Sequence, residues 1–256
     1  MIQQILKGIK AYFGALSLIS KLKLWNFFLI PIFISIITAS VIGLLAYSLS
    51  DNIGYYISKV WIWEWGKETF MTVSQIIGGL TILVVGLIFY KHIIMALSAP
   101  FMSPVSEKIE AHLSGNKLHN HRNTSFNQQL WRGIRINGRN LLKELLISIP
   151  IILIGFIPVI GILSTPLLFV IQAYYAGFGN MDYTLERHFK YKESIDFVKT
   201  NRGLAIGNGI LFIAFLFIPV LGIILVLPLS VTAASTETVT LLQTKGVLNV
   251  SKNTPE

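Results

Sequence analysis

The sequence contains no cysteine and few charged residues. Without cysteine, disulfide bonds, thiolate catalysis and cysteine-ligated metal sites are excluded. Charged residues make up 13% of the chain and hydrophobic residues 53%, and the mean hydropathy is +0.65. This balance is typical of an integral membrane protein, and a chain of 256 residues in that class predicts one helical domain.

Motifs of the common enzyme classes are absent as well. No glycine loop ends in Gly-Lys-Ser or Gly-Lys-Thr, so ATP coupling within this chain is not expected. Neither a Gly-x-Ser-x-Gly elbow nor a His-Glu-x-x-His zinc motif occurs. His119 and His121 are separated by one residue, but no further ligand stands at a metal-binding spacing, so a solvated loop is the preferred interpretation. The sequence therefore predicts no enzyme, no cofactor and no metal.

Basic residues give the chain a net charge of +9. They flank apolar segments and form no nucleic-acid motif, so we expect lipid headgroups or an anionic solute as partners and no nucleic acid. Four lysines precede the first apolar segment, and cations outnumber acids again between positions 91 and 144. Because cytoplasmic loops are enriched in basic residues, the N-terminus and this second segment are placed in the cytoplasm.

Two apolar segments are long enough to cross a bilayer, at about 24–49 and 71–97. An amphipathic helix precedes them at the membrane surface. Its apolar stripe consists of Ile2, Ile5, Leu6, Ile9, Phe13 and Leu16. Between the two spans, an outer loop from Asp51 to Phe70 is dense in tryptophan and tyrosine. Such aromatics commonly anchor a span in the headgroup zone, although a sugar or ligand platform is an alternative.

Two later runs, 145–179 and 203–236, carry no charge. Each is longer than one span of about 20 residues but too short for two spans and a turn. Both are interrupted in the middle by residues that break helices. The expected breakers are Pro158, Gly161, Pro166, Pro219, Gly222 and Pro228. We interpret the runs as two re-entrant helical hairpins that penetrate the bilayer partly, and two proline-kinked single spans are the alternative.

These elements together predict a single membrane domain over 1–244, followed by a polar tail over 245–256. Within the first hairpin, Ser164 and Thr165 precede Pro166, which is a pattern typical of a helix start. The free N–H groups of such a start, placed at membrane depth, would attract an anion without a buried full charge. Alternatively, the two hydroxyls only satisfy the broken backbone.

A basic helix precedes the first hairpin and carries Arg132, Arg135 and Arg139 at spacings of i, i+3 and i+7. These arginines either collect anions at a pore entrance or contact phospholipid, and the sequence favours neither. The spans and hairpins are expected to lack the buried charged residues that ion-coupled pumps use. This expectation leaves passive permeation, or no transport.

Several short motifs occur in the order found in one known family. They are Leu29-Ile30-Pro31, Ala99-Pro100-Phe101 with Glu107 and Glu110, Ile157-Pro158 with Gly161, Asp182-Tyr183, Arg202, Ile218-Pro219 and Leu227-Pro228. Through them the chain resembles the CysZ sulfate permease family, which shares an etoposide-induced-type membrane domain. The resemblance implies a multi-pass protein of the bacterial inner membrane with two long spans and two partly penetrating hairpins. It also implies a homo-oligomer that admits sulfate for cysteine synthesis.

The family carries a Gly-hydrophobic-Arg motif just before the first span, where this chain has Lys21, Lys23 and Asn26 without glycine or arginine. Lysine attracts anions but lacks the planar fork of arginine. These three residues are the candidate anion site by position, and headgroup anchoring is the alternative role of the lysines. The predicted function is a permease for sulfate or a related oxyanion. The alternative is a non-transporting module that organises lipid or partner proteins.

Overall fold

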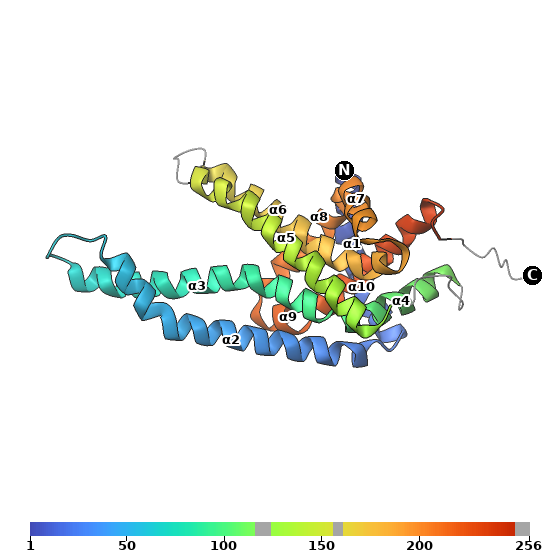
Figure 1. The fold of residues 1–256 in the computed structure, drawn as a ribbon, viewed down its shortest axis with the longest axis horizontal. Coiled ribbons are helices and arrows are strands. Elements are labelled where there is room, and N and C mark those ends of the chain that lie inside the picture. The colour runs from blue at the N-terminus through green and yellow to red at the C-terminus, as the bar shows by residue number, and fades with distance from the viewer. Residues whose placement is uncertain (116–123, 156–160, 249–256) are drawn as a thin grey trace, which may run out of the picture.

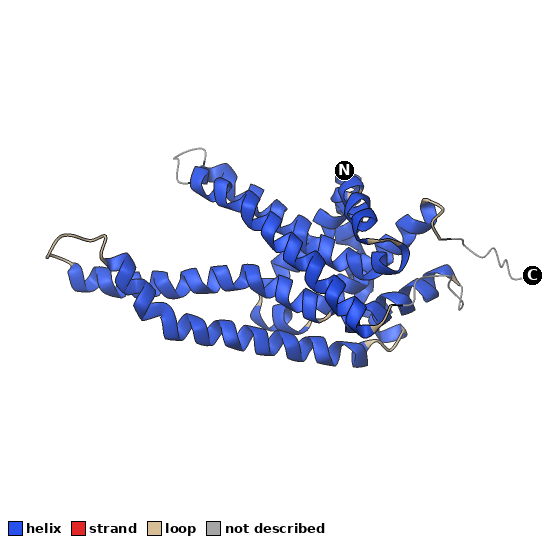
Figure 2. Ribbon diagram, in the orientation of Figure 1, coloured by secondary structure: helices blue, strands red, loops and turns tan. Residues whose placement is uncertain are grey.

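The computed structural model describes residues 1–115, 124–155 and 161–248, and the regular elements in these ranges are all helices (Figures 1 and 2). The helices are α1 (Ile2–Lys21), α2 (Trp25–Ser58), α3 (Lys67–Leu97), α4 (Ala99–Ser114), α5 (Phe126–Gly155), α6 (Gly161–His188), α7 (Tyr191–Thr200), α8 (Arg202–Leu216), α9 (Pro219–Ile224) and α10 (Val226–Thr244). The predicted all-helical fold is confirmed for this part of the chain.

Helices α2 and α3 form a long apolar hairpin that projects from the rest of the molecule (Figure 1). They contain 34 and 31 residues, so at about 1.5 Å per residue each exceeds a hydrocarbon core of about 30 Å. Both are apolar enough to cross a membrane, as is Ile162–His188 within α6. Large apolar side chains such as Leu29 and Leu44 face outward from α2, as expected for contact with lipid.

The loop between these two helices is shorter than the sequence predicted. Helix α2 runs through Asp51 to Ser58, and α3 already begins at Lys67. No proline interrupts the helix after Leu49, and Gly54 lets α2 pack directly on the backbone of Gln75. The predicted start of the outer loop at Asp51 is therefore wrong, because close helix packing continues beyond the apolar segment.

The second hairpin breaks where the sequence predicted. Helix α8 ends at Leu216, α9 begins at Pro219 and contains Gly222, and α10 begins at Val226. Pro228 lies in the first turn of α10, where backbone N–H groups need no helical partner. In the first hairpin α5 ends at Gly155 and α6 begins at Gly161, and Pro158 lies outside the described residues. The depth to which either hairpin enters the bilayer stays a prediction.

The arms of the first hairpin are longer than expected. The arginine-bearing helix and the first arm are one continuous helix, α5, because no glycine or proline breaks the chain near Glu144 and Pro150 is accommodated inside the helix. By its nearly balanced charge, the segment from Met181 to Arg202 is expected to form a separate solvated helix, but α6 extends through its first part to His188. Asp182 and Glu186 in that segment are buried, so the prediction of a solvated connection is wrong there.

Helix α1 confirms the predicted N-terminal helix and shows which face packs. Gly8, Tyr12, Ala15 and Ile19 are buried against α8 and α10. The Tyr12 hydroxyl donates a hydrogen bond of 2.7 Å to the Asn208 carbonyl of α8. In the predicted apolar stripe Ile2, Leu6, Phe13 and Leu16 are exposed, with Phe13 at 85%, whereas Ile5 and Ile9 are half-buried. Helix α1 therefore has one face fixed to the helical core and an apolar stripe facing outward.

Candidate functional site

The turn between α1 and α2 holds the three residues that the sequence singled out for anion binding. Lys21, Lys23 and Asn26 are all exposed. Leu24 and Phe28 are fully buried beside them and anchor the turn to the core. Lys23 has a φ of +53°, a left-handed conformation that is uncommon for a residue with a side chain. The turn thus presents two cations and an amide from a rigid base.

Helix α4 adds two basic side chains that the sequence analysis missed at this position. The Lys108 Nζ lies 4.7 Å from the centre of the Phe27 ring at the start of α2. Lys108 and His112 line an open cavity of about 490 Å³ together with Leu22, which stands between the two turn lysines. We call Lys21, Lys23, Asn26, Lys108 and His112 the basic corner. Its members come from segments about 85 residues apart, so only packing reveals the group.

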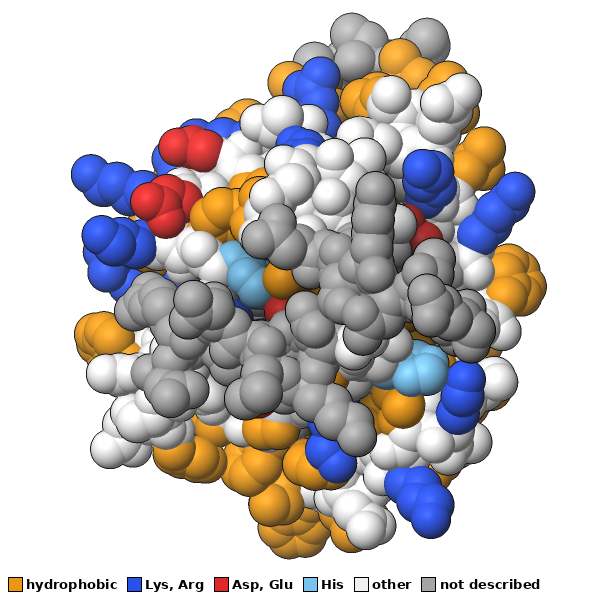
Figure 3. All heavy atoms as spheres, turned by 90° about the vertical axis from the view of Figure 1, so that its right-hand side faces the viewer, with side chains coloured by type: hydrophobic (Ala, Val, Ile, Leu, Met, Phe, Trp, Pro, Cys, Tyr) orange, Lys and Arg blue, Asp and Glu red, His pale blue; other side chains and the backbone are white. Residues whose placement is uncertain are grey.

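The basic corner lies at the end of the molecule opposite the α2–α3 loop. Figure 3 views this end, where lysine and arginine side chains are spread around the rim and acidic side chains are few. Glu107, which is exposed, precedes Lys108 on the same helix. Cations outnumber acids here, so the field at this end favours the approach of anions.

Of the three arginines of α5, Arg132 is already paired with an acidic side chain. Arg132 forms a bidentate pair with Asp182, with its Nε 2.9 Å from Oδ2 and its Nη2 2.8 Å from Oδ1. It also donates to the Ser194 hydroxyl at 2.6 Å. Arg135 covers the Tyr191 ring at 4.0 Å, and Arg139 lies 5.3 Å from the centre of the Phe178 ring. For Arg132 the anion-attracting role is wrong because Asp182 already neutralises it.

Ser164 and Thr165 lie near the tip of the first hairpin, far from the basic corner (Figure 1). Helix α6 begins at Gly161, so Pro166 stands inside the helix and the two hydroxyl residues do not cap it. The predicted helix start at Thr165-Pro166 is therefore wrong. A proline in the second turn removes one backbone hydrogen bond, and the chain has already entered the helix at Gly161. The structure does not bring these hydroxyls together with the lysines of the turn.

Beneath the basic corner, α4 and α6 are joined by a buried cluster of charged side chains. Arg187 Nη2 donates to Glu110 Oε2 at 2.8 Å, and His188 Nε2 lies 3.0 Å from the same oxygen. Arg187 also donates to the Ser106 hydroxyl at 2.7 Å. A second pair, in which the Ser103 hydroxyl donates to Glu186, lies on the same two helices. This cluster fixes the helix that carries Lys108 and His112.

The electrostatics of Glu110 follow from these partners. Burial alone would raise the pKa of the Glu110 carboxyl. The hydrogen bond from His188 and the charge of Arg187 outweigh burial and hold the pKa at about 2. Glu110 is therefore ionised throughout the physiological range, and its charge is matched inside the cluster.

A second buried ionic group joins α3 to α5. Lys91 Nζ donates to Glu144 Oε1 at 2.6 Å, and His92 Nε2 lies 3.0 Å from Glu144 Oε2. All three side chains are at most 3% exposed. The expectation that spans and hairpins lack buried charge is therefore wrong. Lys91 stands only one or two turns from the end of its apolar span, a position typical of the headgroup level, but packing against α5 buries it.

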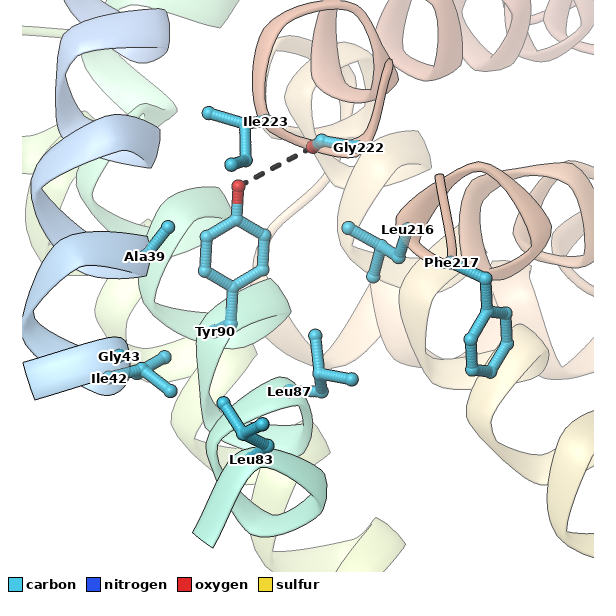
Figure 4. Close-up of a pocket in the computed structure, with 10 residues that line it drawn as sticks. All are labelled: Ala39, Ile42, Gly43, Leu83, Leu87, Tyr90, Leu216, Phe217, Gly222 and Ile223. Carbon is cyan, nitrogen blue, oxygen red and sulfur yellow. Dashed lines mark hydrogen bonds between the residues drawn. The ribbon is translucent and has the colours of Figure 1, made fainter. Parts of the chain in front are cut away.

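An apolar cavity of about 320 Å³ lies between α2, α3 and the tip of the second hairpin. Figure 4 shows Tyr90 at its centre, with its hydroxyl directed at Gly222. The hydroxyl donates to the Gly222 carbonyl at 3.4 Å, and so satisfies one backbone group of the broken helix. Its other lining residues are apolar, for example Leu83 and Ile223, which makes the cavity unsuitable for an inorganic anion.

Comparison with known proteins gives consistent results. The family described as Sulfate transporter CysZ/Etoposide-induced protein 2.4 matches residues 11–226. A Vibrio parahaemolyticus protein named sulfate transporter CysZ is 29% identical over 61% of this chain and 64% of its own length. A Vibrio cholerae protein of the same name is 26% identical over 82% of this chain and 84% of its own length. The chain thus matches just under two thirds of the first relative and most of the second.

Proposed function

Since this chain belongs to the Sulfate transporter CysZ/Etoposide-induced protein 2.4 family, we propose that it is a membrane permease for sulfate or a related oxyanion. The relatives named as sulfate transporters support the choice of sulfate. The observation that carries the proposal is the basic corner, where Lys108 and His112 of α4 line an open cavity beside the α1–α2 turn that carries Lys21 and Lys23. This corner stands at one end of helices long enough to cross a membrane. The role in the cell is sulfate uptake for cysteine synthesis.

Uptake of radiolabelled sulfate into sealed vesicles tests the function directly. Vesicles that contain the purified protein are expected to accumulate sulfate faster than protein-free vesicles of the same lipid. Unlabelled sulfate should compete, and chloride at the same concentration should compete less, because it offers one charge and no oxygen acceptors. Equal rates with and without protein would refute a permease and leave a non-transporting membrane module.

The basic corner is tested by removing its two turn lysines. The double variant Lys21→Gln/Lys23→Gln is expected to insert normally and to slow uptake at low sulfate roughly 3- to 10-fold, because two exposed charges contribute on the order of 1 kcal/mol together. Lys21→Arg/Lys23→Arg should bind oxyanions more tightly, since each guanidinium can donate two parallel hydrogen bonds. The matched control Lys190→Gln/Lys192→Gln alters exposed lysines near α7 and should keep the wild-type rate. Unchanged uptake in both turn variants, with normal insertion, would remove these lysines from the site.

Topology follows from the distribution of basic residues, with the N-terminus cytoplasmic in a bacterial inner membrane. Single cysteines introduced at Glu64 and Lys192, both exposed, test it in this cysteine-free chain. A membrane-impermeant maleimide should label Glu64→Cys from the outer side and Lys192→Cys only from the cytoplasmic side. Labelling of Lys192→Cys from outside would exclude hairpins that enter and leave on the cytoplasmic side.

The proposal includes self-association of the chain. Broken helices at membrane depth need protein or water around their free backbone groups. The outer faces of α5 and α6 stay apolar and exposed, with Leu153 and Ile162 at 63% and 76%. A second copy of the chain would cover these surfaces together with lipid. Crosslinking in membranes should therefore yield species larger than a monomer, and a strictly monomeric protein would contradict this part of the proposal.

A further inference from the structure

One face of α5 carries a row of buried polar side chains. Asn137, Asn140, Glu144 and Ser148 are each at most 6% exposed. Their spacing of three and four residues places them on one side of the helix, over a length of about 16 Å. The opposite side is apolar and outward, as Leu142 at 64% exposed illustrates. A hairpin arm that only anchors the protein in lipid has no need of such a row.

The row meets two basic side chains of α3 at a single carboxylate. Glu144 accepts from Lys91 through one oxygen and is paired with His92 through the other, at 2.6 and 3.0 Å. The acid therefore has two basic partners. If Lys91 turned to another acceptor, Glu144 would still keep His92, and no carboxylate would be left buried without a partner.

Several hydrogen-bond donors in this group make fewer hydrogen bonds to the described residues than their chemistry allows. An ammonium has three N–H donors, and that of Lys91 makes one hydrogen bond, to Glu144. The Asn140 Nδ2 and the Ser148 hydroxyl are buried without a hydrogen-bond partner among the described residues. Buried polar groups are nearly always paired in native proteins, so free donors along one row indicate a ligand or water that they serve.

Lys91 also lines a cavity of about 120 Å³ between α3, α6 and α8. Gln172 of α6 is the other polar residue in its lining, and the remaining lining residues, such as Ile213 of α8, are apolar. The Lys91 ammonium distinguishes this cavity from the apolar one around Tyr90. A space of this size holds several water molecules or one small oxyanion. The cavity is separate from the basic corner, because no residue of the corner contributes to its lining.

We propose that Lys91 and Gln172 form an internal oxyanion site beside the polar row of α5, at which the anion takes the place of Glu144 on the Lys91 ammonium. The site deepens the proposed permease function and rests on it. A dianion such as sulfate offers Lys91 more charge and more acceptor oxygens than one carboxylate does. During the exchange Glu144 keeps its hydrogen bond to His92. The ion pair keeps the site closed until an anion competes for the lysine.

Sulfate uptake per inserted molecule tests this exchange. The double variant Lys91→Gln/Glu144→Gln keeps a neutral hydrogen-bonded pair, so it should fold, yet its uptake should fall at least tenfold because the cation is gone. Glu144→Gln alone frees Lys91, and the KM for sulfate should drop at least threefold while the maximal rate decreases. The exposed pair Asp196→Asn/Lys199→Gln removes equivalent charges on α7 and should leave uptake unchanged.

The same measurements can also contradict the internal site. If Lys91–Glu144 is only a structural pair, the double variant should transport like the wild type and Glu144→Gln should keep the wild-type KM; either result overturns the internal site. Thermal unfolding in detergent establishes which variants are folded. Should the double variant fail to fold, the KM of Glu144→Gln decides. Absence of uptake by the wild type would instead refute the permease itself, so the two failures are distinguishable.

Discussion

Gly177→Ala and Gly209→Ala are each expected to lower the melting temperature of the detergent-solubilised protein by roughly 5–10 °C. Gly177 of α6 lies against the Ala205 carbonyl of α8, and Gly209 of α8 lies against the Ala173 carbonyl of α6. A Cβ at either glycine would overlap that backbone oxygen. Two helices can meet this closely only where small residues repeat every four positions, as they do on both helices here.

The magnitude follows from the kind of atom that is in the way. A flexible side chain can turn aside, but a carbonyl moves only with its helix, so α6 and α8 must separate. Overpacking of this kind costs about 1–3 kcal/mol, and 1 kcal/mol corresponds to about 2–4 °C for a domain of this size. The double variant should lose less than the sum of the two single losses, because the first substitution already separates the helices.

Gly138→Ala provides the matched control. Gly138 lies inside α5, and a Cβ there would meet no atom within 4 Å. The substitution removes a flexible residue from a helix, so it should raise stability by about 0.5–1 kcal/mol. Equal, small effects at positions 138, 177 and 209 would mean that α6 and α8 do not pack as closely as the structure has them.

The helices themselves could be predicted from the sequence because local chemistry determines them. Long apolar segments require helices in a membrane. A new helix, α9, begins at Pro219, so the second hairpin is interrupted just before this proline. Pro166 was misinterpreted because the same residue type is tolerated both at a helix start and a turn later. Whether Pro166 starts the helix or lies inside it depends on where the helix begins. The apolar residues around Gly161 include no capping residue that would indicate this start.

The charged clusters could not be predicted because they depend on tertiary packing. Arg187 and Glu110 are 77 residues apart, and Lys91 and Glu144 are 53 residues apart. Helical periodicity cannot pair residues this far apart in the sequence. Each charged residue taken alone is typical of a solvated or headgroup position. The turn lysines were found because they directly precede an apolar span. Lys108 joined them only once α4 was seen to pack at the start of α2.

Arg187→Met is the second substitution with a large expected effect, a loss of about 3–5 kcal/mol at neutral pH. The Glu110 carboxylate is fully buried, and Arg187 is its closest charged partner at 2.8 Å. Without the guanidinium, the carboxylate must stay charged in an apolar site or take up a proton. The loss should appear as a melting temperature roughly 10 °C below that of the wild type. Removing one cation from the exposed pair by Lys199→Met should cost well under 1 kcal/mol.

The difference in melting temperature between the wild type and Arg187→Met should depend on pH, and this dependence identifies Glu110 as the cause of the lost stability. The pKa of Glu110 is depressed from 4.5 to about 2 in the folded protein. Its ionised form therefore stabilises the wild type fully above pH 4.5, by about 3 kcal/mol, and this contribution declines as the pH falls toward 2. Arg187→Met has already lost most of that contribution, so the two melting temperatures should approach each other as the pH falls from 4.5 toward 2. The double variant Arg187→Met/Glu110→Met should recover most of the stability at pH 7, since it buries no charge in this pair. Packing alone would explain the effect if the difference in melting temperature between the wild type and Arg187→Met stayed constant with pH. The same conclusion would follow if the double variant were no more stable than Arg187→Met.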